Sequence, residues 1–193
     1  MQHDLERQVG QWRVISGGQT GVDRAALDAA LQMGWCPLHR RAEDGRIPLV
    51  YPLKETQARS YAVRTEWNVR DSDGTLVLVL DEISSGTQLT IAAAARLGKP
   101  CRIEYLRQPQ GGVVAGRLPL SAGPFLSLSQ RAADVVNWLR QREICVLNIA
   151  GPRGSSSPDV YPEARQFVEQ LLGQWQAVQA GETLASLDAR EVK

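Results

Sequence analysis

The stretch Ile15-Ser16-Gly17-Gly18-Gln19-Thr20-Gly21-Val22-Asp23 decides the fold of this chain. A short apolar run, residues 12–15, leads into it, and an alanine-rich pattern with helical spacing, residues 22–33, leads out of it. A strand, a glycine-rich turn and a helix start in this order can bind phosphate-like anions. The reason is that the first N–H groups of a helix are unpaired and carry the positive end of its dipole. The pattern alone leaves a structural turn and an anion-binding loop equally open.

Several residue types in this loop suit a ligand. Glycine lets the backbone adopt positive φ or approach a ligand closely, while Gln19 and Thr20 add hydrogen-bonding groups. Asp23 could cap the helix, or meet a cation or a hydroxyl group. The loop lacks the lysine of a Walker A motif and does not match the dinucleotide-binding spacing, so neither of those motifs is present.

Length and composition indicate a soluble protein with one sizeable domain. The chain has 193 residues, of which 43% are hydrophobic and 22% charged, and its formal net charge is +1. No global charge would attract nucleic acid or an anionic membrane, and no apolar run approaches the ~20 residues of a membrane span. The three cysteines, an odd and widely spaced set, argue against a disulfide framework and a cysteine zinc site. We therefore expect a cytoplasmic protein without a structural metal, a covalent cofactor, or a nucleic-acid or membrane partner.

The order of apolar and periodic segments predicts an α/β fold with a mostly parallel sheet and helices on both faces, a three-layer sandwich. A single domain is expected over residues 12–175, with terminal extensions at 1–11 and 176–193 and an irregular excursion at 107–128. We predict that Gly34 ends the first helix as a C-cap and that Ser129 caps a later one. Further strands are expected at 35–38, 75–80, 102–106 and 145–149, and further helices at 58–69, 89–97, 130–141 and from 159 onward.

Three glycine- and hydroxyl-rich turns, residues 16–21, 84–87 and 151–157, follow predicted strands. The carboxyl ends of parallel strands lie on one edge of the sheet, so these turns can converge there. Arg153 and a long polar loop, residues 39–48, belong to the same edge. This convergence favours a pocket for a nucleotide or another oxyanion.

The residues do not define a reaction. With two histidines in the chain, no Ser-His-Asp set can be recognised. Arg64, Asn68 and Asp71 share one helix face, and Glu66 and Arg70 are spaced as an i,i+4 pair on another. Carboxylates near the expected pocket could bind a cation or ribose hydroxyls, but their spacing does not define a metal-binding loop. They are Asp23, Glu43, Asp44, Glu66, Asp71 and Asp73.

Long ordered motifs resemble a known family. They are Ser16-Gly-Gly-Gln-Thr-Gly-Val-Asp23, Gly34-Trp-Cys-Pro37, Arg40-Arg-Ala-Glu-Asp-Gly45, Tyr51-Pro-Leu53, Arg64-Thr-Glu66, Asn68-Val-Arg-Asp-Ser-Asp-Gly-Thr-Leu76 and Asn148-Ile-Ala-Gly-Pro-Arg153. These segments look like the molybdenum carrier family, the circularly permuted YpsA-like branch of the SLOG group of Rossmann-like proteins. The match extends from about residue 13 to residue 172.

The resemblance implies a Rossmann-like domain that binds a nucleotide-like ligand, with molybdenum cofactor as a candidate, and we expect a homo-oligomer. Alternatives are a phosphoribohydrolase-like enzyme that cleaves an N-glycoside, with Glu66 and Asp71 as candidate catalytic residues, and a nucleotide sensor. The hydrolases of the wider group have a Gly-Thr-x-x-Glu motif, but here Thr90 stands where that Glu would be. The implied ligand-binding residues are Gly17, Gly18, Gln19, Thr20, Gly21, Asp23, Arg41, Asn68, Gly86, Thr87, Gly151, Pro152 and Arg153.

Overall fold

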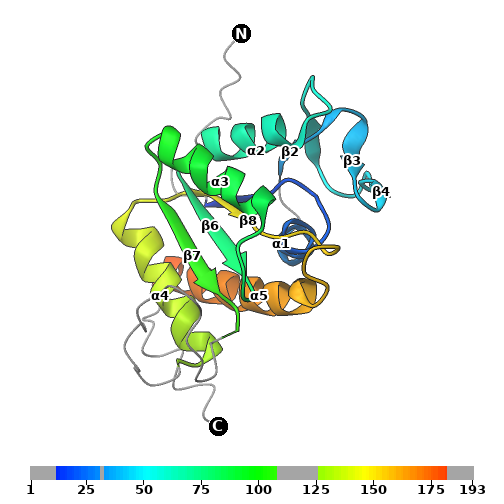
Figure 1. Cartoon of the computed structure of the whole chain (residues 1–193). Coiled ribbons are helices and arrows are strands. Elements are labelled where there is room, and N and C mark those ends of the chain that lie inside the picture. Colours follow the sequence, from blue (N-terminus) through cyan, green and yellow to red (C-terminus); the bar gives the residue numbers. More distant parts are fainter. Residues whose placement is uncertain (1–11, 31–32, 108–125, 182–193) are drawn as a thin grey trace.

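A four-stranded parallel sheet forms the centre of the molecule (Figure 1). The structure is a computed structural model and describes residues 12–30, 33–107 and 126–181. The strand order is β1 (Arg13–Ile15), β8 (Val146–Ala150), β6 (Gly74–Val79) and β7 (Cys101–Tyr105). All neighbouring pairs are parallel, so the predicted α/β class is confirmed.

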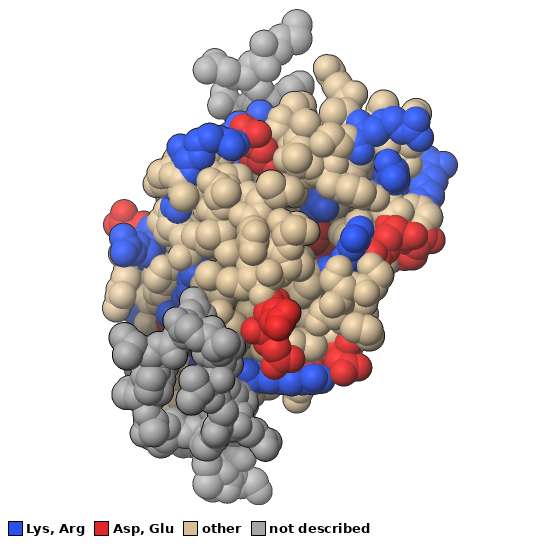
Figure 2. All heavy atoms as spheres, in the orientation of Figure 1, with Lys and Arg blue, Asp and Glu red and all other residues tan. Residues whose placement is uncertain are grey.

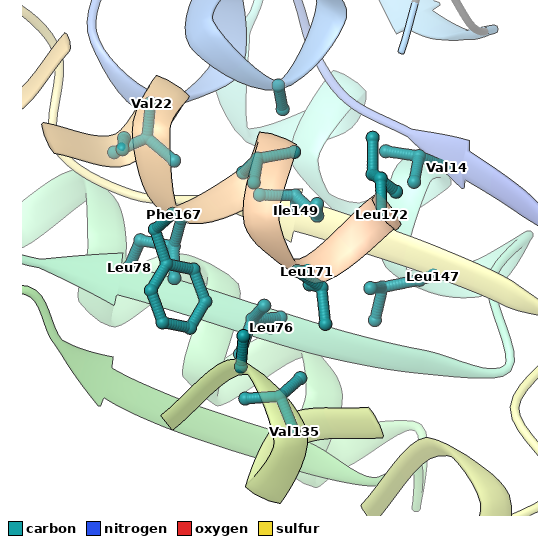
Figure 3. Close-up of a cluster of buried hydrophobic side chains, with 14 of the residues drawn as sticks. Val14, Val22, Leu76, Leu78, Val135, Leu147, Ile149, Phe167, Leu171 and Leu172 are labelled. Atoms are coloured by element: carbon teal, nitrogen blue, oxygen red, sulfur yellow. The ribbon is translucent and has the colours of Figure 1, made fainter. Parts of the chain in front are cut away.

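Helices cover both faces of this sheet (Figure 1). On one face, α1 (Val22–Ala30), α4 (Leu128–Gln141) and α5 (Val160–Gln179) enclose the main hydrophobic core. Figure 3 shows Val14, Leu76 and Leu147 of the strands directed toward α5 and α4. On the other face, α2 (Tyr61–Arg70) and α3 (Ser85–Arg96) pack through Val69, Ala93 and Ala94. The result is the predicted three-layer sandwich.

Burial on both faces of the sheet explains why the sequence of the central strand β6 is continuously apolar. Every residue of Gly74–Val79 is buried, as expected for a parallel strand that is covered on both faces. The predicted strand at 75–80 is confirmed with a shift of one residue. The helix bounds that were predicted agree with the structure to within a few residues, apart from α3, which begins four residues earlier, at Ser85.

Residues 34–55 were expected to be a short strand and a long polar loop, but they form a small structured unit. It contains β2 (Gly34–Cys36), the 3-10 turn η1 (Leu38–Arg40), β3 (Arg41–Ala42), β4 (Gly45–Arg46) and β5 (Leu53–Glu55). β2 pairs with β5 in parallel, and β3 and β4 form an antiparallel hairpin. The unit has its own apolar cluster, formed by Leu27, Cys36, Ala42, Ile47, Tyr51 and Leu53.

Arg40 fixes the base of this unit. Its buried guanidinium group donates to the carbonyl oxygens of Ile47, Leu53, Pro48 and Tyr51 at 2.8–3.0 Å. A buried arginine that satisfies several carbonyl groups replaces the hydrogen bonds that a regular sheet would supply. This long-range role cannot be recognised in the sequence, where Arg40 is one of several loop arginines.

Two predicted helix caps were wrong. Gly34 is the first residue of β2 and packs against the Ser16 backbone, where an added Cβ would lie 2.0 Å from the Ser16 carbonyl oxygen. The N-cap of α4 is Ser127, because Ser127 and Gln130 form a capping box. Ser129 is instead buried and accepts a hydrogen bond from Gln174 Nε2 at 2.8 Å.

The expected terminal extensions are described only in part. α5 continues to Gln179, so residues 176–179 belong to the last helix, whereas residues 1–11 and 182–193 lie outside the described residues, as does most of the 107–128 excursion. In the described part of the chain, no helix has the length and apolar character needed to cross a membrane.

Candidate functional site

The glycine-rich loop, residues 16–21, connects β1 to α1 and is tied to the neighbouring strand β8. The Ser16 hydroxyl group donates to the Ile149 carbonyl oxygen at 2.7 Å, and the Val22 N–H donates to Pro152 O at 3.3 Å. Gly21 has a φ of +74°, and an added Cβ there would lie 2.4 Å from Pro152 O. A residue with a side chain would therefore be both strained and obstructed at this position.

A buried ion pair lies beneath this loop. Arg64 Nη1 of α2 lies 2.6 Å from Asp23 Oδ2 of α1, and both side chains are almost fully buried. The Gln19 N–H also donates to this carboxylate oxygen, at 3.3 Å. Burial raises the pKa of Asp23, while Arg64 and the Gln19 amide group oppose that shift. One predicted role of Asp23 was to meet a cation. In the structure that cation is the Arg64 guanidinium group of the protein itself.

The loop is joined to the hairpin β3–β4 and to the turn that follows β8. Gln19 Oε1 accepts from the N–H groups of Thr20 at 3.1 Å and Glu43 at 2.9 Å. The Thr20 hydroxyl group accepts from the Gly154 N–H at 3.0 Å and donates to Glu43 Oε1. Two of the three predicted turns, 16–21 and 151–157, therefore lie in contact.

The Glu43 carboxylate is the centre of this network. It accepts from the Ser155 N–H at 3.0 Å, from the Ser155 hydroxyl group and from Thr20, and it lies 3.4 Å from Arg153 Nε. Burial opposes the ionisation of Glu43, but the hydrogen bonds from Ser155 and Thr20 outweigh it and lower its pKa. Glu43 is thus a carboxylate at neutral pH, and it occupies a cradle of groups suited to an anion. We refer to Thr20, Arg153 and Ser155 as the donor cradle.

Two arginines around the loop have unused donors. Among the described residues, Arg24 Nε and Arg64 Nε are buried atoms without a hydrogen-bond partner. Arg24 Nη2 donates to Gly18 O at 3.2 Å, and the Arg24 guanidinium carbon lies 5.3 Å from the centre of the Tyr51 ring. Figure 2 shows basic and acidic atoms gathered around a recess on the right of the molecule, over α1 and the turn after β8. Buried unpartnered polar atoms are uncommon in folded proteins and call for an explanation.

The glycines themselves are covered. Arg64 lies over Gly17, and the side chains of Leu53 and Ile47 lie over Gly18, so both glycines are buried. Gly151 packs against Leu78 and Val22, and Pro152 is buried, whereas Arg153 is exposed. The open part of the site therefore consists of Thr20, the hairpin tip and residues 153–155.

Other predicted site residues lie apart from the donor cradle or are engaged in structural contacts. Asn68 is buried and forms two hydrogen bonds with the Trp35 backbone, at 2.8 and 3.0 Å. Arg41, at the base of the hairpin, is exposed with its guanidinium carbon 5.4 Å from the Tyr61 ring centre. Gly86 and Thr87 form the first turn of α3, where Ser84 caps the helix by accepting from the Thr87 N–H. Their turn follows β6, on the same edge of the sheet as the other two turns.

The candidate catalytic carboxylates lie elsewhere on α2. Glu66 is half exposed and pairs with Arg96 of α3 at 3.0 Å, rather than with the predicted partner, Arg70. Asp71 accepts from the Trp35 indole N–H at 2.6 Å and pairs with Arg70 at 2.7 Å. Burial opposes the ionisation of Asp71, but these partners lower its pKa. The contacts of both carboxylates are with residues outside the donor cradle.

Three residues of the site were not among the predicted ligand contacts: Glu43, Arg64 and Ser155. Glu43 was one of six candidate carboxylates, and Ser155 belonged to a predicted turn, so the signal was present but did not distinguish them. Arg64 shares a helix face with Asn68, as their spacing predicted, and both are buried, whereas the sequence left open whether this polar stripe is solvated or faces a site. Among the described residues, no group of three or more His, Cys, Asp or Glu side chains could hold a metal ion.

The parallel sheet, with a glycine-rich turn after its first strand, defines a Rossmann-like protein, and the adjoining cradle is its candidate site at the carboxyl edge of the sheet. The sequence profile of the circularly permutated YpsA SLOG family matches residues 14–172, so the chain belongs to this family. No relative was found among proteins with curated descriptions.

A solved structure agrees with this assignment. The chain is similar to a protein from Syntrophus aciditrophicus SB whose crystal structure is described as that of a "Putative molybdenum carrier protein". The two are 37% identical, with a TM-score of 0.72, over 84% of this chain and 96% of that one. The family and fold that the motifs indicated are thereby confirmed.

Proposed function

We propose that this protein binds a small nucleotide-like ligand through a phosphate or a related oxyanion, at the carboxyl edge of the sheet. The observation that carries this proposal is the donor cradle, in which a main-chain N–H, two hydroxyl groups and a guanidinium group converge on one carboxylate. Charge-assisted hydrogen bonds of these kinds are the ones that bind phosphate groups in proteins.

Molybdenum cofactor is our candidate for the ligand because the Syntrophus relative is described as a molybdenum carrier. The part of that cofactor for which this chain supplies a matching surface is its phosphate group, which suits Thr20, Ser155 and Arg153. A nucleotide would present the same group. The donor cradle therefore supports the phosphate end of the ligand and leaves open which organic group is attached to it.

A nucleotide hydrolase is the alternative, and Glu43 is the carboxylate nearest to the proposed phosphate. In the free protein this carboxylate is held by Thr20 and Ser155, and Thr90 stands where the hydrolases of the wider group have the Glu of their Gly-Thr-x-x-Glu motif. We therefore prefer binding over hydrolysis. Incubation of the protein with AMP and GMP separates the two, because release of free base that Glu43→Gln or Asp71→Asn abolishes would favour the enzyme.

The binding proposal is tested by mass spectrometry of small molecules that copurify with the native protein, and by thermal shifts with AMP, GMP and extracted molybdenum cofactor. Arg153→Ala removes the exposed cation of the donor cradle and is expected to reduce the shift. Arg165→Ala is the matched control, because its side chain is 48% exposed, against 52% for Arg153, and also pairs with a glutamate. Equal shifts in both variants would contradict the proposal.

A further inference from the structure

We propose that the tip of the β3–β4 hairpin is a built-in competitor for the ligand, in which the Glu43 carboxylate occupies the position that the phosphate group of the ligand takes. This inference rests on the proposed function and names the group that is recognised, a terminal phosphate monoester. It also assigns a regulatory role to a short segment that the sequence left open as either a solvated loop or part of a ligand pocket.

The contacts of Glu43 are those expected of a bound anion. Thr20 and Arg153 approach its two carboxylate oxygens, and Ser155 contributes both its main-chain N–H and its hydroxyl group. These partners come from the turns after β1 and β8, which are more than 100 residues apart in the sequence. A phosphate oxygen accepts from the same kinds of donor with similar geometry. A carboxylate and a phosphate cannot share these donors, because two like charges in one site repel each other strongly.

The base and the tip of the β3–β4 hairpin are held by different kinds of contact. Its base is held by Arg40 and by the buried side chains of Ala42 and Ile47. Its tip consists of Glu43 and Asp44, whose side chains make polar contacts with the donor cradle and with Arg24. Apolar burial keeps the base in place, whereas the tip is held by polar contacts: the hydrogen bonds of Glu43, including that of its N–H to Gln19 Oε1, and the half-exposed pair of Asp44 with Arg24. A phosphate group can replace the Glu43 carboxylate in such contacts without disrupting the apolar base.

Asp44, the second acidic residue of the tip, provides a matched control for Glu43. Asp44 lies 3.4 Å from Arg24 Nη1, and its side chain is 45% exposed, whereas the Glu43 side chain is 20% exposed. Asp44→Ala therefore removes the same charge from the same hairpin without opening the donor cradle. A general change in electrostatic attraction would affect both variants, but release of a competitor would affect only Glu43→Ala.

The test measures binding of inorganic phosphate to the full-length protein by isothermal titration calorimetry. If the docked tip keeps the binding-competent state to about one tenth of the population, Glu43→Ala should bind phosphate roughly tenfold more tightly than the wild type. Asp44→Ala should differ from the wild type by about twofold at most, as expected for a neighbouring exposed charge. Addition of Arg153→Ala to Glu43→Ala should abolish the gain.

The results that would overturn the inference are distinct from those that would overturn the proposed function. Equal phosphate affinities in the wild type, Glu43→Ala and Asp44→Ala would exclude a competing carboxylate. Weaker binding in Glu43→Ala would instead make Glu43 a ligand contact. A third result is that Glu43→Ala binds phosphate roughly tenfold more tightly than the wild type while AMP, GMP and molybdenum cofactor fail to stabilise any variant. That result would support the competing role of Glu43 and contradict the proposal of a nucleotide-like ligand.

Discussion

A methyl group on Gly17 would lie 1.5 Å from Arg64 Nη1, so the Arg64 guanidinium group fills the space beside the glycine loop that a side chain would occupy. The absence of a Cβ at Gly17 thus admits a cation from α2, and this cation neutralises Asp23 of α1. The first glycine of the motif serves an internal ion pair here. This role explains why the loop is buried, although its sequence resembles an open anion-binding turn.

Gly17→Ala should therefore destabilise the protein by displacing Arg64 from Asp23. Breaking one side of a buried ion pair costs about 3–5 kcal/mol, and partial relaxation of the arginine should place this variant near the lower end. Urea denaturation measures the loss. Gly173→Ala is the control, because this glycine of α5 has no atom within 4 Å of an added Cβ. That change should stabilise the helix by about 0.5–1 kcal/mol.

The clash can be isolated in a second background. When Arg64→Ala has already emptied the space, Gly17→Ala displaces nothing and should add little further loss. The two substitutions are therefore expected to be strongly non-additive, as contacting residues usually are. The same cost of Gly17→Ala in both backgrounds would mean that displacement of Arg64 is not what makes alanine unfavourable at this position.

Arg64 and Asp23 should also depend on each other. Arg64→Met leaves Asp23 buried without its cation and should cost about 3–5 kcal/mol. Asp23→Asn combined with Arg64→Met removes both charges, while the amide oxygen of the introduced asparagine can still accept from the Gln19 N–H. The double variant should consequently be more stable than Arg64→Met alone, as measured by urea denaturation. If the loss of stability in the double variant equals the sum of the losses in Asp23→Asn and Arg64→Met measured singly, the two charges do not interact.

The sequence was a good guide to the central sheet and a poor one to residues 34–55. Strand β6 could be predicted because it is buried on both faces and is therefore continuously apolar. The strands β2 to β5 have two or three residues each, too few to show a periodicity. Their arrangement depends on Arg40, whose carbonyl partners lie up to 13 residues away.

The sequence predicted that the turns after β1 and β8 would meet, but it did not predict the side-chain contacts between them. The shared edge of a parallel sheet brings the turns after β1 and β8 together, and this follows from topology. The pairing of Asp23 with Arg64 spans 41 residues, and that of Glu43 with Ser155 spans 112. Such pairs arise only when the helices and the hairpin pack, so no local pattern could separate Glu43 from the other acidic residues.

The capping box of α4 gives a direct test of the corrected helix start. The Ser127 hydroxyl oxygen accepts from the Gln130 N–H at 3.1 Å, and Gln130 Oε1 accepts from the Ser127 N–H at 2.9 Å. Ser127→Ala should cost about 1 kcal/mol, whereas Ser127→Gly should cost only a few tenths of a kcal/mol, roughly, because glycine is itself a tolerated N-cap. Chemical denaturation of both variants measures the difference. Equal losses would argue against side-chain capping by Ser127.

Asp28 of α1 joins two tyrosines, and this contact predicts how the protein responds to alkaline pH. The Tyr51 hydroxyl group donates to Asp28 Oδ1 at 2.5 Å, and the Tyr161 hydroxyl group donates to Oδ2 at 2.7 Å. Burial, together with the hydrogen bond to Asp28, raises the pKa of Tyr51 to about 12. The folded-state pKa is thus above the unfolded value of about 10, so the folded state binds the phenol proton more tightly.

The stabilisation linked to Tyr51 is therefore fully present below about pH 10 and is lost as the pH rises through about 12. A shift of this size corresponds to about 2–3 kcal/mol. Urea midpoints measured across this range should fall in the wild type, and tyrosinate absorbance should show late-titrating tyrosines, because burial and Asp28 raise the pKa of Tyr161 as well. Tyr51→Phe should lose about 1 kcal/mol at neutral pH and reduce the alkaline fall, of which the part linked to Tyr161 remains. Tyr61→Phe, whose ring faces Arg41, should retain the full fall. An unchanged fall in Tyr51→Phe would assign the alkaline loss to another group.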